Sequence, residues 1–98
     1  MDTNCKVLLT SQVNENVSAE LMVFLKENLP KVRNFNGCIS VEILFNVETN
    51  NMVFHEVWKS KVHHVKYIEF ITANGIMNSL ANFLVASPEI QYYTIENI

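Results

Sequence analysis

The sequence predicts an α+β fold of the ferredoxin-like type, β-α-β-β-α-β, in which helices cover one face of a four-stranded antiparallel sheet. Along the chain, the spacing of apolar residues switches between the two-residue period of strands and the helical period, in that order of elements. Right-handed crossovers then bring the helical segments to the same face of the sheet. With 98 residues, the chain is expected to form a single domain over residues 1–98.

The first strand is predicted at Cys5–Val13, where apolar and β-branched residues are dense and the turn-prone Asn14–Asn16 follows. From Val17 the spacing becomes helical, with Ser18 as the expected N-cap. A kink is expected at Pro30, because proline removes one backbone hydrogen bond from a helix. The apolar stripe of this helix consists of Val17, Leu21, Phe24, Leu25, Leu29 and Val32.

Two strands joined by a polar turn are predicted in the middle of the chain. Gly37 suits a left-handed turn after the first helix, and Cys38–Val47 and Met52–Trp58 then alternate on both sides of the turn Glu48–Asn51. In the first of these strands, one face carries Ile39, Val41, Ile43 and Phe45; in the second, one face carries Met52, Phe54, Glu56 and Trp58.

The last third of the chain is predicted to form two helices and a strand. Ser60 is a good N-cap for a helix that runs to about Thr72, where Asn74–Gly75 interrupts it. After Ser87–Pro88, the segment Ile90–Ile95 has the composition of a strand. The intervening helix is expected to place Ile76, Leu80, Phe83 and Leu84 on one side.

The composition excludes several classes of protein. Hydrophobic residues make up 49% of the chain and charged residues 17%, which excludes intrinsic disorder and favours an oligomer. The net charge of −3 and the lack of a basic run argue against nucleic-acid binding. No apolar stretch approaches the roughly 20 residues that cross a membrane, and the N-terminal residues do not resemble a leader peptide. We therefore expect a cytoplasmic protein with no membrane partner.

The predicted strand order has two consequences. Because the first strand neighbours the third and fourth, Cys5 and Cys38 lie on non-adjacent strands and are expected to be free thiols. Apolar residues also fall on whichever face of the sheet the helices leave open, and a second copy of the chain would bury them, which predicts a homodimer. The two alternative sets are Leu44, Val53 and Val57, or Met52, Phe54 and Trp58.

Candidate site residues concentrate between His55 and Tyr67. A zinc-protease motif would need a histidine where Lys59 stands, and the adjacent His63 and His64 project about 100° apart on a helix, so we expect no metal site. With two glycines, the chain has no nucleotide-binding fingerprint and no Gly-rich phosphate loop. Any catalysis must then use histidine, tyrosine, tryptophan or amide groups in an apolar cleft.

Two stripes of the second predicted helix compete to pack on the sheet. One carries His63, Tyr67 and Phe70, and the neighbouring one carries His64, Ile68 and Ile71. Tyr67 and Trp58 can also be read as ordinary core residues. Glu56 shares a strand face with apolar neighbours, so its carboxylate must be paired, hydrogen-bonded or shifted in pKa. It belongs either to a structural network or to a site.

The chain resembles the antibiotic biosynthesis monooxygenase domain family over nearly its whole length. The resemblance is carried by Phe35–Cys38, by Glu56–Ser60, by Tyr67 nine positions after the tryptophan, by Gly75 and by Pro88–Tyr93. It implies a homodimer whose two sheets close into an α/β barrel, with a cleft between sheet and helices in each subunit. In this family, the position of Tyr67 faces the cleft.

The resemblance implies a cofactor-independent monooxygenase that oxidises a small quinol- or anthrone-like aromatic with dioxygen, using neither metal nor flavin. Members that degrade heme have a tryptophan in place of Tyr67 and a later histidine, which is missing from Asn74–Asn78. Close relatives also carry an arginine that this chain lacks in Tyr67–Ile71, which argues against an acidic substrate.

On this hypothesis, Tyr67 and His64 are catalytic, through proton transfer or hydrogen bonding. Trp58 forms an aromatic wall and Glu56 orients its neighbours, while His63 and Phe70 complete the expected substrate-binding set. Two other hypotheses remain open at this point: a non-catalytic dimeric module that binds an apolar small molecule, and a small-molecule isomerase that consumes no oxygen.

Overall fold

A computed structural model describes residues 4–98. The first three residues, to which the leader-peptide expectation refers, lie outside the described residues. The predicted order of elements is confirmed, including the short helix before the last strand. The elements are β1 (Cys5–Gln12), α1 (Ser18–Arg33), β2 (Cys38–Asn46), β3 (Asn51–Trp58), α2 (Lys61–Ala73), α3 (Ile76–Ala81) and β4 (Glu89–Thr94).

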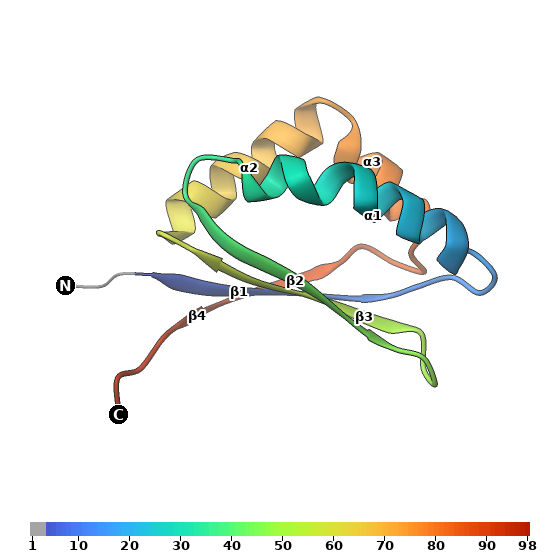
Figure 1. The fold of residues 1–98 in the computed structure, drawn as a ribbon, viewed down its shortest axis with the longest axis horizontal. Coiled ribbons are helices and arrows are strands. Elements are labelled where there is room, and N and C mark those ends of the chain that lie inside the picture. Colours follow the sequence, from blue (N-terminus) through green and yellow to red (C-terminus); the bar gives the residue numbers. More distant parts are fainter. Residues whose placement is uncertain (1–3) are drawn as a thin grey trace.

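The strands of the described chain form an antiparallel sheet in the order β2-β3-β1-β4, so β1 neighbours β3 and β4 as predicted. All three helices lie on one face of this sheet, and the other face is uncovered (Figure 1). In the sheet register, Cys5 of β1 and Cys38 of β2 both pair with Trp58 of β3, one from each side. They therefore lie on non-adjacent strands, and both are free, half-buried thiols.

The core lies between the sheet and the helices. Val7 on β1 and Met52 and Trp58 on β3 are fully buried on the covered face, opposite Leu21 and Leu25 of α1. Burying each such side chain stabilises the fold by about 1.5–3 kcal/mol relative to leaving it in water. The alternation along β1 and β3 therefore fixes the covered face, and it also brings the polar Glu56 into the core.

The start of α1 differs from the prediction. Ser18 is the first helical residue, and Val17 is the N-cap, without any side-chain capping hydrogen bond. The preceding turn explains this, because Asn16 has a positive φ of 64° and completes the turn one residue earlier than the capping rule assumed. At the other end, α1 continues through Pro30 to Arg33, whose Nη2 donates to the carbonyl of Val41 at 2.9 Å.

Two apolar positions were also misplaced by simple periodicity. Ile39 was predicted on the face of Val41, yet its side chain is 48% exposed, because the register of β2 against β3 shifts between Cys38 and Ser40. A bulge adds one residue to a strand and so reverses the face of the residue that it displaces. Leu84 is buried beyond the end of α3, where it forms a bridge with Val13 rather than another helical turn.

The uncovered face of the sheet carries the first of the two alternative apolar sets. Leu44 and Tyr93 are exposed there, and Val53 and Val57 are half-buried. The same face holds an acid–histidine pair, with Oε1 of Glu42 at 3.5 Å from Nδ1 of His55. Within residues 4–98, no helix has the length and hydrophobicity needed to cross a membrane.

Candidate functional site

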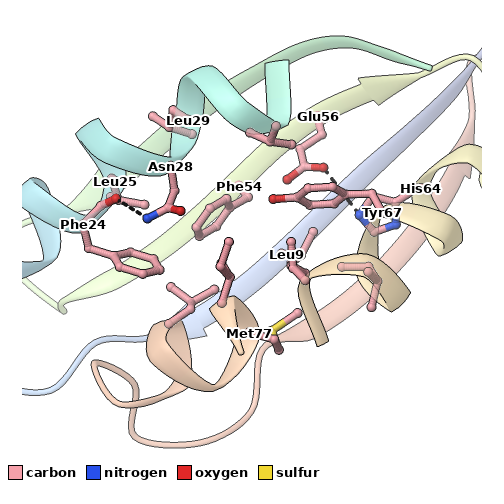
Figure 2. Close-up of a pocket in the computed structure, with 15 residues that line it drawn as sticks. Leu9, Phe24, Leu25, Asn28, Leu29, Phe54, Glu56, His64, Tyr67 and Met77 are labelled. Atoms are coloured by element: carbon pink, nitrogen blue, oxygen red, sulfur yellow. Dashed lines mark hydrogen bonds and ion pairs between the residues drawn. The ribbon is translucent and has the colours of Figure 1, made fainter. Parts of the chain in front are cut away.

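A cavity of about 40 Å³ lies between the covered face of the sheet and helices α1, α2 and α3, all of which contribute residues to its lining. Its walls are mostly apolar and include Leu9, Phe54, Ile71 and Met77. The polar residues that line it are Asn28, Glu56, His64 and Tyr67. Figure 2 shows Glu56, His64 and Tyr67 gathered at one end of the cavity, with Asn28 at the other end beyond Phe54.

Glu56 reaches this place through strand alternation. It sits between Val7 of β1 and Val41 of β2 in the sheet register and is only 2% exposed. Trp58, two residues along the same face, donates its indole N–H to Oε1 of Glu56 at 2.7 Å. Burial raises the pKa of Glu56 to about 7, although the Trp58 hydrogen bond favours the carboxylate. The carboxyl group is therefore able to gain or lose a proton near neutral pH.

His64 enters the cavity from the first turn of α2. Ser60 caps this helix as predicted, accepting the backbone N–H of His63 at 3.2 Å, and the next residue, His64, is fully buried against the sheet. Its Nδ1 lies 2.8 Å from the hydroxyl of Tyr92, and its Nε2 lies 3.5 Å from Oε1 of Glu56. Burial lowers the pKa of His64 to about 4, so the imidazole is neutral at physiological pH.

Tyr67 stands one turn further along α2 in an aromatic cluster. Its ring centroid is 5.1 Å from that of Phe35 and 5.4 Å from that of Trp58. Burial raises the pKa of the Tyr67 hydroxyl, and the nearby Glu56 carboxyl adds to the effect. The hydroxyl is therefore a hydrogen-bond donor at all ordinary pH values, and it points toward the cavity end that holds Glu56 (Figure 2).

The other three residues expected at the site lie outside the cavity lining. Trp58 is fully buried beneath it, with its indole N–H committed to Glu56. His63 turns toward Gly37, and its Nδ1 lies 2.7 Å from Oγ of Ser60. Gly37 has a φ of 94°, and any side chain there would collide with the His63 ring, so both constraints require glycine.

Phe70 lies on the outer side of α2, 53% exposed, with its ring centroid 5.5 Å from that of Phe35. The stripe of α2 that packs most deeply is the one with His64 and Ile71, while Tyr67 lies at its edge. The structure thus brings Glu56, His64 and Tyr67 together and separates Phe70 from them.

Two polar residues near the cavity escaped the sequence analysis. The side-chain amide of Asn28 donates to the carbonyl of Phe24 at 2.8 Å, which leaves its Oδ1 as an acceptor on the cavity side (Figure 2). Its signal in the sequence was a polar residue interrupting the apolar stripe of α1. Tyr92 bonds to His64 from β4, 28 positions later in the chain, and no local pattern predicts this pair.

Chemically, the cavity combines a carboxyl group of pKa about 7, a neutral imidazole and a phenol that holds its proton. Such a set can remove a proton from a bound molecule, donate a hydrogen bond to the resulting anion, and return the proton later. Within the described part of the chain, no three His, Cys, Asp or Glu side chains come together as metal ligands do.

No family model matches the sequence, and no curated protein matches it. Solved structures do match over nearly the whole chain. A conserved protein of Methanosarcina mazei Go1 is 21% identical, with a TM-score of 0.84 over 97% of this chain and 95% of that one. A Bordetella bronchiseptica protein, provisionally assigned as an antibiotic biosynthesis monooxygenase, is 11% identical, with a TM-score of 0.84 over 97% and 99% of the two chains.

A third similar structure is a monooxygenase from the gene ActVA-Orf6 of Streptomyces coelicolor, in complex with the ligand nanaomycin D. It is 14% identical and has a TM-score of 0.79 over 99% of this chain and 91% of that one. At these identities the similarity establishes the fold and leaves the chemistry to be argued from the cavity.

Proposed function

We propose that this chain, which has the fold of the antibiotic biosynthesis monooxygenases, is itself a cofactor-independent monooxygenase acting on a small quinol- or anthrone-like aromatic. The observation that carries the proposal is the buried carboxyl group of Glu56 in the lining of a mostly apolar cavity, where burial raises its pKa to about 7. A base with its pKa near the working pH is the group that such a reaction needs from the protein, because the electrons come from the substrate.

In the proposed reaction, the carboxylate of Glu56 takes the acidic proton of the substrate. The resulting anion passes one electron to dioxygen, and the two radicals combine to form a carbon–oxygen bond. For a ring methylene, the peroxide then loses water: one oxygen atom stays as a carbonyl, and the other leaves with two hydrogens. The proton held by Glu56 returns during this last step, so the protein ends in its starting state.

Within this mechanism, the phenol of Tyr67 donates a hydrogen bond to the substrate oxyanion, because burial holds its pKa well above neutral. His64 positions the Glu56 carboxylate across the 3.5 Å gap between Nε2 and Oε1. At the far end, Oδ1 of Asn28 accepts a hydrogen bond from a hydroxyl group of the substrate. The proposal gives Glu56 the role of base, where the sequence suggested that it orients its neighbours, and leaves His64 a hydrogen-bonding role, since the pKa of His64 is lowered to about 4.

The size of the cavity adds a requirement. Ligand sites in proteins commonly measure about 300–1,000 Å³, and a cavity of about 40 Å³ does not hold an aromatic ring. Helix α3 supplies Met77 and Leu80 to the outer wall, and it follows Gly75, which has a φ of 88° and open space around its α-carbon. In the proposed function α3 moves outward about Gly75 to admit the substrate.

The proposal includes a homodimer formed by the uncovered face of the sheet. Leu44 and Tyr93 are exposed on this face beside the half-buried Val53 and Val57, and a second copy would remove this apolar surface from water. Analytical ultracentrifugation at micromolar concentration is expected to give twice the chain mass of 11.3 kDa. A monomeric mass would contradict the dimer and leave the cavity chemistry untouched.

An isomerase is the second candidate, and the paired placement of Glu56 and Tyr67 favours it over a purely binding role. A carboxylate that removes a proton beside a phenol that can stabilise the enolate also suits a reaction that returns the proton to another carbon. This reaction consumes no oxygen, so oxygen uptake separates it from the proposed function.

The experiment that tests the proposal is oxygen uptake by metal-stripped protein with a panel of anthrones and quinols. We expect uptake above the uncatalysed background, falling by about 10²-fold in Tyr67→Phe. Tyr93→Phe is the matched control, because that hydroxyl bonds Gln91 on the surface, away from the cavity. Uptake that is unchanged in Tyr67→Phe would remove Tyr67 from the mechanism. If no substrate gives uptake, the oxygenase proposal fails, and substrate isomerisation should be assayed next.

A further inference from the structure

A line of polar groups crosses the core from the cavity to the edge of the sheet. It begins at Glu56, whose Oε1 lies 3.5 Å from Nε2 of the fully buried His64. It continues from Nδ1 of His64 to the hydroxyl of Tyr92 at 2.8 Å. Tyr92 is half-buried on β4, an edge strand, so the line joins the cavity to a residue in contact with solvent.

The two nitrogens of His64 are held differently. Nδ1 has a hydrogen-bond partner in Tyr92, whereas Nε2 is buried and has no hydrogen-bond partner within residues 4–98. An unpartnered buried polar atom is costly, typically by about 1–3 kcal/mol. Oε1 of Glu56 lies 3.5 Å from Nε2, and a small closure of this gap would give Nε2 a hydrogen-bond partner.

A neutral imidazole carries one N–H, so two arrangements are available. When Glu56 is ionised, the proton of His64 belongs on Nε2, facing the carboxylate, and Nδ1 accepts the hydroxyl proton of Tyr92. When Glu56 is protonated, Nε2 accepts from the carboxylic acid, and the proton on Nδ1 is donated to the oxygen of Tyr92. Each state of Glu56 therefore selects one tautomer of His64.

We propose that Glu56, His64 and Tyr92 form a proton path in which uptake of one proton by Glu56 switches the tautomer of His64 and reverses its hydrogen bond with Tyr92. In uptake, water gives a proton to the Tyr92 oxygen, Tyr92 passes its own to Nδ1, and Nε2 passes its proton to Glu56. Release runs the three transfers backward, and neither His64 nor Tyr92 keeps a charge. Tyr92 is thus a positioning residue of the site.

Of the titratable groups around this path, those with a raised pKa do not take up or release protons in the pH range in which Glu56 does. The pKa of Cys38 is raised to about 11 and that of Tyr67 is also raised, both mainly by burial, so neither competes with Glu56 near pH 7. The ammonium of Lys61 lies 4.8 Å from the ring centroid of Tyr92 and disfavours a positive charge resting on that hydroxyl. The facing groups are Tyr67 and Lys61 of α2, Cys38 of β2 and Cys5 of β1.

Nitrogen NMR of the free protein, labelled in its histidine rings, tests the tautomer switch. Variants His55→Gln and His63→Gln assign the other two rings. For His64 we expect one ring nitrogen to show the ¹⁵N shift of a protonated nitrogen and the other that of an unprotonated nitrogen, and the two to exchange these shifts with a midpoint near pH 7. Above pH 5, the two nitrogens should not both show the shift of a protonated nitrogen, as they would in an imidazolium. In Glu56→Gln the switch should vanish. A single tautomer at every pH, or an imidazolium between pH 5 and 6, would overturn the proposal.

The variant Tyr92→Phe tests the route to solvent. We expect the exchange rate of His64 near pH 7, measured by relaxation dispersion, to fall by about tenfold or more, with Tyr93→Phe unchanged. Equal rates in the two variants would overturn the role of Tyr92; if Tyr92→Phe does not fold, the Glu56→Gln spectrum still decides the switch. Because these readouts need neither substrate nor oxygen, their failure is distinguishable from failure of the oxygenase proposal.

Discussion

The two faces of the sheet each hold a carboxyl group 3.5 Å from a histidine, and the two pairs differ chiefly in burial. On the covered face, the side chains of His64 and Glu56 are 0% and 3% exposed. On the uncovered face, those of His55 and Glu42 are 31% and 71% exposed. Burial raises the pKa of Glu56 to about 7 and lowers that of His64 to about 4, so it favours the neutral form of both groups. In the single subunit the Glu42–His55 pair is open to water, which weakens the interaction between its two groups. Equal distances therefore do not imply equal chemistry.

The largest expected difference between the two pairs is in turnover. Glu56→Gln removes the proposed base and should lower kcat by about 10²–10⁴-fold. The matched change on the uncovered face, Glu42→Gln, should alter kcat by less than about twofold, since it lies outside the cavity. Oxygen-uptake kinetics on both variants measure this, with circular dichroism to confirm folding. Comparable losses of kcat in the two variants would show that the buried pair has no special role in turnover.

The pH dependence of kcat/KM is the second expected difference between the two pairs. Because the carboxylate of Glu56 is the active form and its pKa is about 7, the rate should rise with pH and level off above 7. Below that value, each pH unit should cost about tenfold. A rate that stays level from pH 5 to 8 would exclude Glu56 as the base. The profile of Glu42→Gln should overlay that of the wild type.

Stability should also respond to the covered pair. Because the pKa of Glu56 is raised in the folded protein, its contribution to stability is fully present below pH 4.5 and is lost as the pH rises to about 7. Because the pKa of His64 is lowered, its contribution to stability is lost as the pH falls from 6.5 to about 4. The two slopes oppose each other. In His64→Leu the Glu56 slope alone remains, and the free energy of unfolding should fall by up to about 1.4 kcal/mol per pH unit.

Urea unfolding of His64→Leu between pH 5 and 7 measures this slope, with His55→Leu as the control on the uncovered face. An increase in stability with pH in His64→Leu would mean that burial of Glu56 does not govern its ionisation.

The smallest effect is expected on the uncovered face. At protein concentrations low enough to keep the chain monomeric, Glu42→Gln should change the free energy of unfolding by less than about 1 kcal/mol, because exposed ion pairs contribute little. Urea titration near pH 6 is the measurement. A loss of several kcal/mol would indicate that Glu42 and His55 are shielded from water in solution.

The sequence anticipated much of the site but not its arrangement. Strand alternation, a local rule, placed Glu56 on the same face of its strand as Phe54 and Trp58, and its carboxyl group was expected to need a partner or a shifted pKa; its burial in the core came from the structure. The choice between His63 and His64 could not be made, since both fit helical spacing. The deciding contacts are the capping of α2 by Ser60 and the close approach of His63 to Gly37, which join separate elements.

By itself, the sequence determined the order of elements, the strand order and which residues share each face of β3, because these follow from periodicity and chain connectivity over short ranges. Only the tertiary structure decided that His64 faces Glu56, that Phe70 lies outside, and that Tyr92 completes the line of polar groups. Those outcomes depend on how far α2 is rotated about its axis above the sheet. That angle is set by packing between residues distant in the chain, which no local pattern encodes.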